Sequence, residues 1–155
     1  MPGSWPSHEL PNLTIQTCQV TSAASRRYNC IAWASKDTTR WWWPDAQGLY
    51  YWPPGVPREE TLPAFMLAYE KQGYKLCFND SLQAGVEKIA IFGHKQLDGI
   101  AVPTHAALQL ESGEWSSKLG IFEDVRHKSL DDANGPAYGK MICCMSRPRP
   151  APKVE

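Results

Sequence analysis

Cys30 is the residue whose type and position most directly suggest chemistry. Asn29, directly before it, is a favoured helix N-cap because its side-chain oxygen accepts a free backbone N–H, and the apolar run 31–34 suits a buried helix. A helix N-terminus favours negative charge, so it lowers the pKa of a thiol placed there and makes it a better nucleophile. The sequence predicts a thiol nucleophile at Cys30; the alternative is a small buried core residue, which most free cysteines are.

A cysteine nucleophile needs a base, and His105 is the histidine best placed to act as one. It opens an apolar segment typical of a strand, whereas His8 lies near the N-terminus, His94 in a polar turn and His127 in a charged stretch. The predicted catalytic pair is therefore Cys30 and His105. The alternative for His105 is a structural histidine bonded to a loop carbonyl.

Segments 104–110 and 115–119 are expected to form a hairpin whose turn lies at 111–114. Strand side chains alternate between two faces, so the register decides which side chains accompany His105. With a two-residue turn, the His105 face also carries Gln109, Ser116 and Lys118.

The group that would orient His105 is left open, because none of these side chains is a carboxylate. Lys118 has no acceptor for an imidazole N–H, and a one-residue change of register would bring Ser117 to its place. Asp124, Gln109 and Ser117 are the candidates for a third member of the site.

Residues 41–57 form a segment rich in aromatic residues, proline and glycine that fits no regular element. Three consecutive tryptophans, 41–43, cannot all point inward on a strand or helix, so at least one should be partly exposed. The segment is predicted to wall a substrate cleft beside Cys30, and the alternative is that its aromatics cover a small core. The predicted substrate-binding residues are Asn29, Trp33, Trp41, Trp42, Trp43, Tyr51, Trp52 and Lys118.

The elements that would position these residues are two helices followed by strands. The first helix is expected from Asn29 to about 37–39, and the second from 57 or 61 to Gln72, where apolar residues recur with helical spacing. Strands are expected at 88–92, 104–110, 115–119 and 138–145. The predicted fold class is α+β, with N-terminal helices packed on a small, mostly antiparallel sheet.

A cysteine at the start of an early helix, followed by a histidine on a later strand, resembles the papain-like cysteine peptidase and amidase superfamily. The resemblance rests on the order of the elements. It implies the compact amidase type of fold, in which Cys30 attacks a carbonyl and His105 transfers the protons. It also implies a polar third residue, one strand further on, that orients the histidine.

A closer resemblance is to a small, uncharacterised family of fungal and bacterial domains, over roughly residues 28–148. The motifs that carry it are Asn29-Cys30-Ile31-Ala32-Trp33-Ala34, Trp41-Trp42-Trp43-Pro44, Tyr51-Trp52-Pro53-Pro54-Gly55-Val56-Pro57-Arg58, Thr104-His105-Ala106-Ala107 and Trp115-Ser116-Ser117-Lys118-Leu119-Gly120. This resemblance implies no particular activity.

The 155 residues suffice for one domain, expected at 11–146 between a flexible lead-in at 1–10 and a flexible proline-rich tail at 147–155. The 16 basic and 16 acidic side chains leave no net charge, which disfavours nucleic acid or a membrane as a partner. No secretory signal, membrane-length apolar run, phosphate loop or metal-ligand spacing occurs in the sequence. A cytoplasmic protein with reduced thiols and no metal or other cofactor is expected.

The leading hypothesis from the sequence is a cysteine-nucleophile hydrolase or acyl transferase that acts on an amide, ester or thioester. Its substrate would be a small molecule or peptide-like. One alternative is a non-catalytic module that binds a ligand or a protein in the tryptophan-rich groove. Another is an enzyme of secondary metabolism that uses the pocket without a covalent intermediate.

Overall fold

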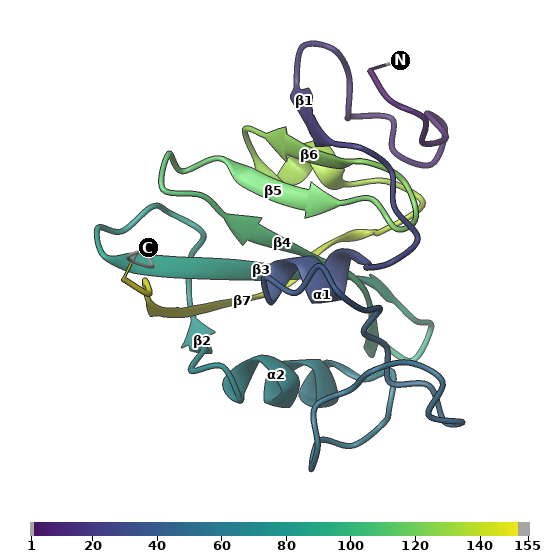
Figure 1. Cartoon of the computed structure of the whole chain (residues 1–155), viewed down its shortest axis with the longest axis vertical. Helices are drawn as coiled ribbons and strands as arrows, with labels where there is room; N and C mark the ends of the chain where they lie inside the picture. Colours follow the sequence, from purple (N-terminus) through teal and green to yellow (C-terminus); the bar gives the residue numbers. More distant parts are fainter. Residues whose placement is uncertain (1, 152–155) are drawn as a thin grey trace.

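A computed structural model describes residues 2–151 and consists mostly of one seven-stranded sheet (Figure 1). Its strands are β1 (Cys18–Ser22), β2 (Lys75–Cys77), β3 (Val86–Lys95), β4 (Ala101–Gln109), β5 (Trp115–Lys118), β6 (Asp124–His127) and β7 (Lys140–Pro148). All neighbouring strands are antiparallel. Their order is β1-β6-β5-β4-β3-β7-β2, so β1 and β2 form the edges and β4 lies in the centre.

Two short helices, α1 (Cys30–Ala34) and α2 (Leu62–Glu70), cover one face of the sheet. α1 packs on β4 and β5, and α2 also reaches β4. The hydroxyl of Tyr69 in α2 donates to the carbonyl oxygen of Ile31 in α1 at 3.0 Å, which ties the two helices together. A 3-10 helix, η1 (Leu130–Ala133), packs against β6 and β7.

Both helices begin at a side-chain cap and end earlier than the sequence predicts. The Asn29 side chain accepts a backbone N–H of the first turn of α1 at 3.2 Å, and Thr61 caps α2 in the same way at 3.3 Å. α1 stops at Ala34 because Lys36 has a φ of 61°, a left-handed conformation in which a helix cannot continue. The helix expected to reach 37–39 is therefore only five residues long.

The predicted α+β class, with N-terminal helices packed on a small sheet, is wrong: the protein is mostly β, with α-helices of 5 and 9 residues. The sheet has seven strands, whereas the sequence predicted four; the strands not predicted are β1, β2 and β6. These strands have only five, three and four residues, too few to show a clear alternation of apolar and polar side chains. β1 also precedes both helices and pairs with the distant β6, so the compact amidase arrangement is not found.

The sheet carries a core on each face. Ala106 and Leu108 of β4 pack with α1 and α2, whereas Ala107 packs with Phe92 and Trp115 on the opposite face. Side chains alternate between the faces along a strand, so this pattern fixes the face of every candidate residue on β4.

The segment before β1 is packed against the sheet rather than free. Trp5 is 0% exposed and lies in a cluster with Leu119 and Val125. In the segment 1–10, which was expected to be a flexible lead-in, Trp5 and Leu10 are thus buried. Met1 lies outside the described residues.

The chain is also held at its other end. β7 extends to Pro148, and the guanidinium of Arg149 lies 3.3 Å from the carboxylate of Glu87. The first part of the tail expected to be flexible at 147–155 therefore belongs to the sheet. Residues 152–155 lie outside the described part of the chain.

Candidate ligand-binding site

A hollow of about 300 Å³, which we call the α1 pocket, lies at the N-terminus of α1. It is lined by Asn29, Cys30, Trp41, Trp43, Tyr50, Thr104, Gly120 and Tyr138. Four of these eight residues are aromatic, and none is an acid, a lysine or an arginine. The pocket therefore offers aromatic faces together with a thiol and a few uncharged polar groups.

Asn29 joins the start of α1 to the aromatic segment. Its Nδ2 donates to the carbonyl oxygen of Trp42 at 2.7 Å, and its Oδ1 accepts the N–H groups of Trp42 at 3.1 Å and Ala32 at 3.2 Å. Asn29 is 3% exposed, so these bonds satisfy an amide that water does not reach. Asn29 therefore has a structural role in the pocket: it holds the aromatic segment against the start of α1, and we call this set of bonds the clasp.

The aromatic segment turns Trp41 and Trp43 toward the α1 pocket and Trp42 away from it. The N–H of Trp43 donates to the carbonyl of Tyr51 at 3.0 Å, and the N–H of Tyr51 donates to the carbonyl of Trp41 at 3.1 Å. The backbone is therefore extended here and its side chains alternate. Trp42, only 4% exposed, joins the core, which explains how three consecutive tryptophans are accommodated.

The other aromatic residues predicted to bind substrate pack behind the pocket. Trp33, Trp42 and Trp52 each donate their indole N–H to a protein acceptor at 2.8–2.9 Å. Tyr51 lies beneath the guanidinium of Arg40, which is 3.4 Å from the ring centroid. These four aromatic residues support the wall and do not line the pocket.

Cys30 is buried, and this burial raises the pKa of its thiol to about 11. The Sγ atom lies 3.9 Å from the carbonyl oxygen of Thr104. Because α1 has only five residues, its dipole does not outweigh the loss of solvation, and the lowered pKa expected at a helix N-terminus is not found. Cys30 carries a protonated thiol at neutral pH.

Cys30 is expected to react slowly with iodoacetamide at pH 7, at least about tenfold more slowly than the half-buried Cys77, because only an accessible thiolate is alkylated. The rate at Cys30 should increase as the pH approaches 11. Brief labelling of the native protein followed by peptide mapping measures both rates. Labelling of Cys30 before Cys77 at pH 7 would show that the thiol is activated.

His105 lies on the opposite face of β4 from Cys30. The hairpin register differs by one residue from that of a two-residue turn, so Ser117 rather than Lys118 shares the His105 face. His105 Nε2 lies 3.0 Å from Ser117 Oγ. The structure does not bring Cys30 and His105 together as a pair.

His105, Ser117 and His127 form a buried chain of hydrogen bonds whose direction can be assigned. His127 Nδ1 lies 2.8 Å from the carbonyl oxygen of Ser129, which can only accept, so the proton is on Nδ1. Neutral His127 then accepts the Ser117 hydroxyl at Nε2, and Ser117 accepts the N–H of His105 Nε2. Burial and the nearby His127 hold the pKa of His105 well below its ordinary value. Nδ1 of His105 has no partner among residues 2–151.

Tyr138 connects this buried chain to the α1 pocket. Its ring lines the pocket and stacks on His105, with the ring centroids 3.9 Å apart and the planes inclined by 10°. His105 therefore supports one aromatic wall of the pocket from behind, which is a positioning role.

Of the three candidates for a third site member, Ser117 alone bonds His105. Asp124 accepts two hydroxyl groups, at 2.7 and 3.1 Å, on the other face of the sheet. Gln109 donates to a backbone carbonyl at 2.9 Å. The carboxylate and the amide are both held away from the imidazole.

Lys118 is fully buried beside the α1 pocket without lining it. Its Nζ donates to the carbonyl oxygens of Ser25, at 2.7 Å, and Gly120, and it lies 4.8 Å from the centroid of the Tyr28 ring. Burial lowers the pKa of Lys118, and the neighbouring Asp124 works against this effect. Lys118 fixes the turn at Gly120, which forms part of the pocket wall.

Four lining residues were not among those predicted from the sequence: Tyr50, Thr104, Gly120 and Tyr138. Tyr50 and Thr104 directly precede the predicted site residues Tyr51 and His105, so their position in the sequence could have indicated them. Nothing in the sequence could have indicated Tyr138, because only the pairing of β7 with the central strands brings residue 138 to the start of α1.

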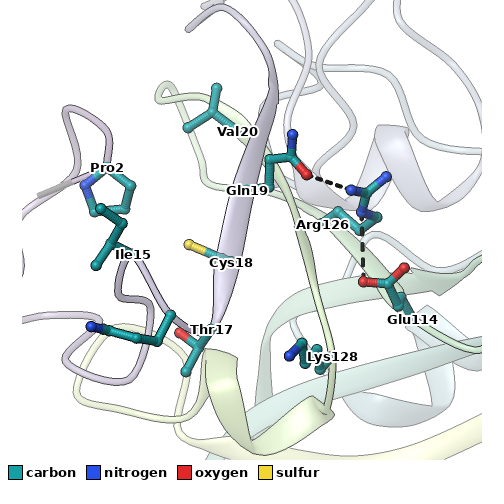
Figure 2. Close-up of a pocket in the computed structure, with 10 residues that line it drawn as sticks. Pro2, Ile15, Thr17, Cys18, Gln19, Val20, Glu114, Arg126 and Lys128 are labelled. Carbon is teal, nitrogen blue, oxygen red and sulfur yellow. Dashed lines mark hydrogen bonds and ion pairs between the residues drawn. The ribbon is translucent and has the colours of Figure 1, made fainter.

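A larger hollow, of about 590 Å³, opens along the edge strand β1 (Figure 2). Figure 2 shows Arg126 bonded to Gln19 and paired with Glu114, whose carboxylate is 3.5 Å from the guanidinium. Glu114 thus offsets the charge of Arg126, and Lys128 adds one further positive charge to the lining. None of the predicted site residues lines it, and the α1 pocket is the stronger candidate.

Within the described range, no group of three or more histidine, cysteine or acidic side chains could hold a metal ion. The helices between residues 2 and 151 are also too short or too polar to cross a membrane.

Fold and pocket together define a mostly β domain with an aromatic hollow at the start of a short helix. The family model described as Domain of unknown function (DUF7689) matches residues 19–146, and the chain belongs to this family. No curated protein and no solved structure matches the chain. The papain-like resemblance is not supported by these comparisons.

Proposed function

We propose that the protein is a ligand-binding domain whose α1 pocket holds a neutral, ring-bearing small molecule. The observation that carries the proposal is the lining, in which Trp41, Trp43, Tyr50 and Tyr138 surround a cavity of about 300 Å³. This volume is at the lower end for ligand pockets, which are mostly aromatic and apolar with a few polar groups. Aromatic faces stack on planar rings and on the apolar faces of sugars.

Polar selectivity in the pocket would come from the indole N–H groups of Trp41 and Trp43. The indole N–H groups of Trp33, Trp42 and Trp52 donate to protein acceptors. Those of Trp41 and Trp43 donate to no acceptor among residues 2–151. A ligand with acceptor oxygens suits such donors. A charged ligand does not suit the pocket, because it would lose its hydration without meeting an opposite charge.

Coumarin, a neutral planar molecule with acceptor oxygens, is a suitable probe of this proposal. We expect it to bind, and we expect coumarin-3-carboxylate to bind at least about tenfold more weakly because its charge has no partner in the pocket. Trp43→Ala should weaken coumarin binding by roughly tenfold or more, since it removes a stacking face. Isothermal titration calorimetry measures all three affinities.

Phe78→Ala is the matched control, because Phe78 is 93% exposed and lies outside the pocket. This variant should bind coumarin as the unaltered protein does. Equal affinity for the neutral and the charged probe, or equal loss in Trp43→Ala and Phe78→Ala, would reject the proposed pocket.

A second candidate function is thiol-dependent hydrolysis or acyl transfer on an amide, ester or thioester bound in the same pocket. The position of Cys30 in the lining favours it. His105 would not be the base in this arrangement, because its Nε2 bonds Ser117 on the other face of the sheet. With p-nitrophenyl acetate as the probe, a burst of nitrophenolate that disappears in Cys30→Ser would support this function, and an unchanged rate in that variant would reject it.

We also propose that the protein is located in the cytoplasm. All five cysteines are free thiols, which suits a reducing compartment.

A further inference from the structure

Cys77 and Cys144 lie directly opposite each other on two antiparallel strands, and neither lines the α1 pocket. They are paired residues in the register of β2 and β7, and Cys77 packs against the buried cluster that contains Cys144. Directly opposed residues have Cα atoms about 4.5 or 5.5 Å apart. A disulfide requires about 4.4–6.8 Å between Cα atoms, so the backbone is already positioned for this bond.

We propose that Cys77 and Cys144 form a redox site, which closes to an intramolecular disulfide by exchange with a low-molecular-weight disulfide. The proposal does not depend on the function assigned to the α1 pocket. Cys77 is half-buried at the edge strand and meets the reagent first, whereas Cys144 is 5% exposed and acts second.

A buried ammonium group lies beside both thiols. Lys88 is 0% exposed, and its Nζ donates to the backbone oxygen of Asn79 at 3.0 Å. The Cys77 thiol donates to the same oxygen at 3.5 Å, so the thiol and the ammonium meet there. Burial raises the pKa of the Cys144 thiol to about 12, and the nearby charge of Lys88 acts in the opposite direction. Lys88 thus offsets part of the effect of burial on Cys144, whose thiolate is the form that attacks in the second step.

The exchange balances in two steps. The Cys77 thiol loses its proton to solvent, and its sulfur attacks one sulfur of the reagent R–S–S–R; a Cys77–S–S–R bond forms, and R–S⁻ leaves and takes up a proton. The Cys144 thiol then loses its proton and attacks the Cys77 sulfur, which releases the second R–S⁻ as R–SH. The two protein thiols are oxidised, and the reagent is reduced to two thiols.

The bond would secure an edge of the sheet. β2 has three residues and pairs only with β7 among the described strands. A covalent link at its last pair fixes this edge strand and closes the chain from residue 77 to residue 144 into a loop. Oxidation should therefore raise the midpoint of thermal unfolding, since it restricts the unfolded chain.

The proposal is tested by incubating the native full-length protein with glutathione disulfide, quenching in acid, blocking free thiols with N-ethylmaleimide and mapping the peptides. We expect one linked peptide pair joining Cys77 to Cys144, with two hydrogen atoms lost. Cys77→Ser and Cys144→Ser should each lose the bridge, and Cys144→Ser should instead accumulate glutathione on Cys77.

Cys143→Ser is the matched control, because Cys143 is adjacent in sequence but belongs to the core on the helix face. It should keep the bridge. A Cys143-linked peptide, or a mixed disulfide at Cys77 that never resolves in the unaltered protein, would overturn the proposal. If a variant fails to fold, the peptide map of the unaltered protein still shows whether Cys77 is linked to Cys144.

Discussion

Asn29→Ala should lower the free energy of unfolding by about 2–4 kcal/mol. The substitution removes the cap of a buried helix start, and it leaves two backbone groups of Trp42 without their hydrogen-bond partner. The Asn29 amide bonds the N–H and the carbonyl of Trp42 as well as the first turn of α1. Its loss should also release the aromatic segment, so that coumarin binding is lost together with stability. Urea unfolding followed by circular dichroism measures the change.

Asn12→Ala provides the comparison for this variant. Asn12 is exposed, and its amide makes one bond, to the Asp131 carbonyl at 3.1 Å. We expect a change of at most about 0.5 kcal/mol for this surface substitution. Similar losses in the two variants would show that the clasp at Asn29 does not hold the site together.

Glu87→Ala is expected to lower the free energy of unfolding by about 3–5 kcal/mol, because it removes a buried carboxylate that pairs with three cations. The carboxylate is 1% exposed and lies 2.7 Å from the ammonium of Lys36 and 2.8 and 3.3 Å from the guanidinium groups of Arg147 and Arg149. The hydroxyl of Tyr74 also donates to it at 3.1 Å. Without Glu87, Lys36 after α1 and the two arginines near the end of β7 lose their shared partner.

The same cluster predicts how stability depends on pH. Burial by itself would raise the pKa of Glu87, but the hydrogen bonds from Lys36 and Arg147 hold it below its ordinary value of 4.5. A carboxyl whose pKa is lowered by folding contributes stability above its unfolded pKa, and this contribution is lost as the pH falls through its folded pKa. Below pH 4.5, the unaltered protein should therefore lose stability more steeply than Glu87→Ala.

Chemical unfolding at pH 7 and at several values between 5 and 3 tests this expectation. Glu70→Ala is the control, since Glu70 is exposed at the end of α2 and makes no ion pair within the described chain. Parallel stability curves for Glu87→Ala and the unaltered protein below pH 5 would contradict the role given to the cluster.

Local features of this fold could be predicted from the sequence where one residue determines one contact. Asn29 marked the start of α1, because an N-cap needs only its own turn. The turn after β4 likewise marked a hairpin. Its register was not fixed, because one residue more or less in the turn exchanges the two faces, and the partner strands decide between them.

The site was harder to predict because it depends on contacts between distant segments. The aromatic segment at 41–57 was expected beside Cys30, and Trp41 and Trp43 lie there with it. The face of His105 follows from the hairpin register, and its stacking on Tyr138 follows from the position of β7. Neither could be derived from the spacing of residues along the chain.

The measurement that tests the central claim most directly is the NMR titration of the seven tryptophan indole N–H signals with coumarin. The α1 pocket predicts that the signals of Trp41 and Trp43 shift together, with one affinity, while those of Trp5 and Trp115, buried in other clusters, stay in place. Coumarin-3-carboxylate, expected to bind at least about tenfold more weakly, should shift these signals far less at the same concentration. Binding that shifts the backbone signals of β1 and leaves Trp41 and Trp43 unaffected would place the ligand in the larger hollow and contradict the proposed site.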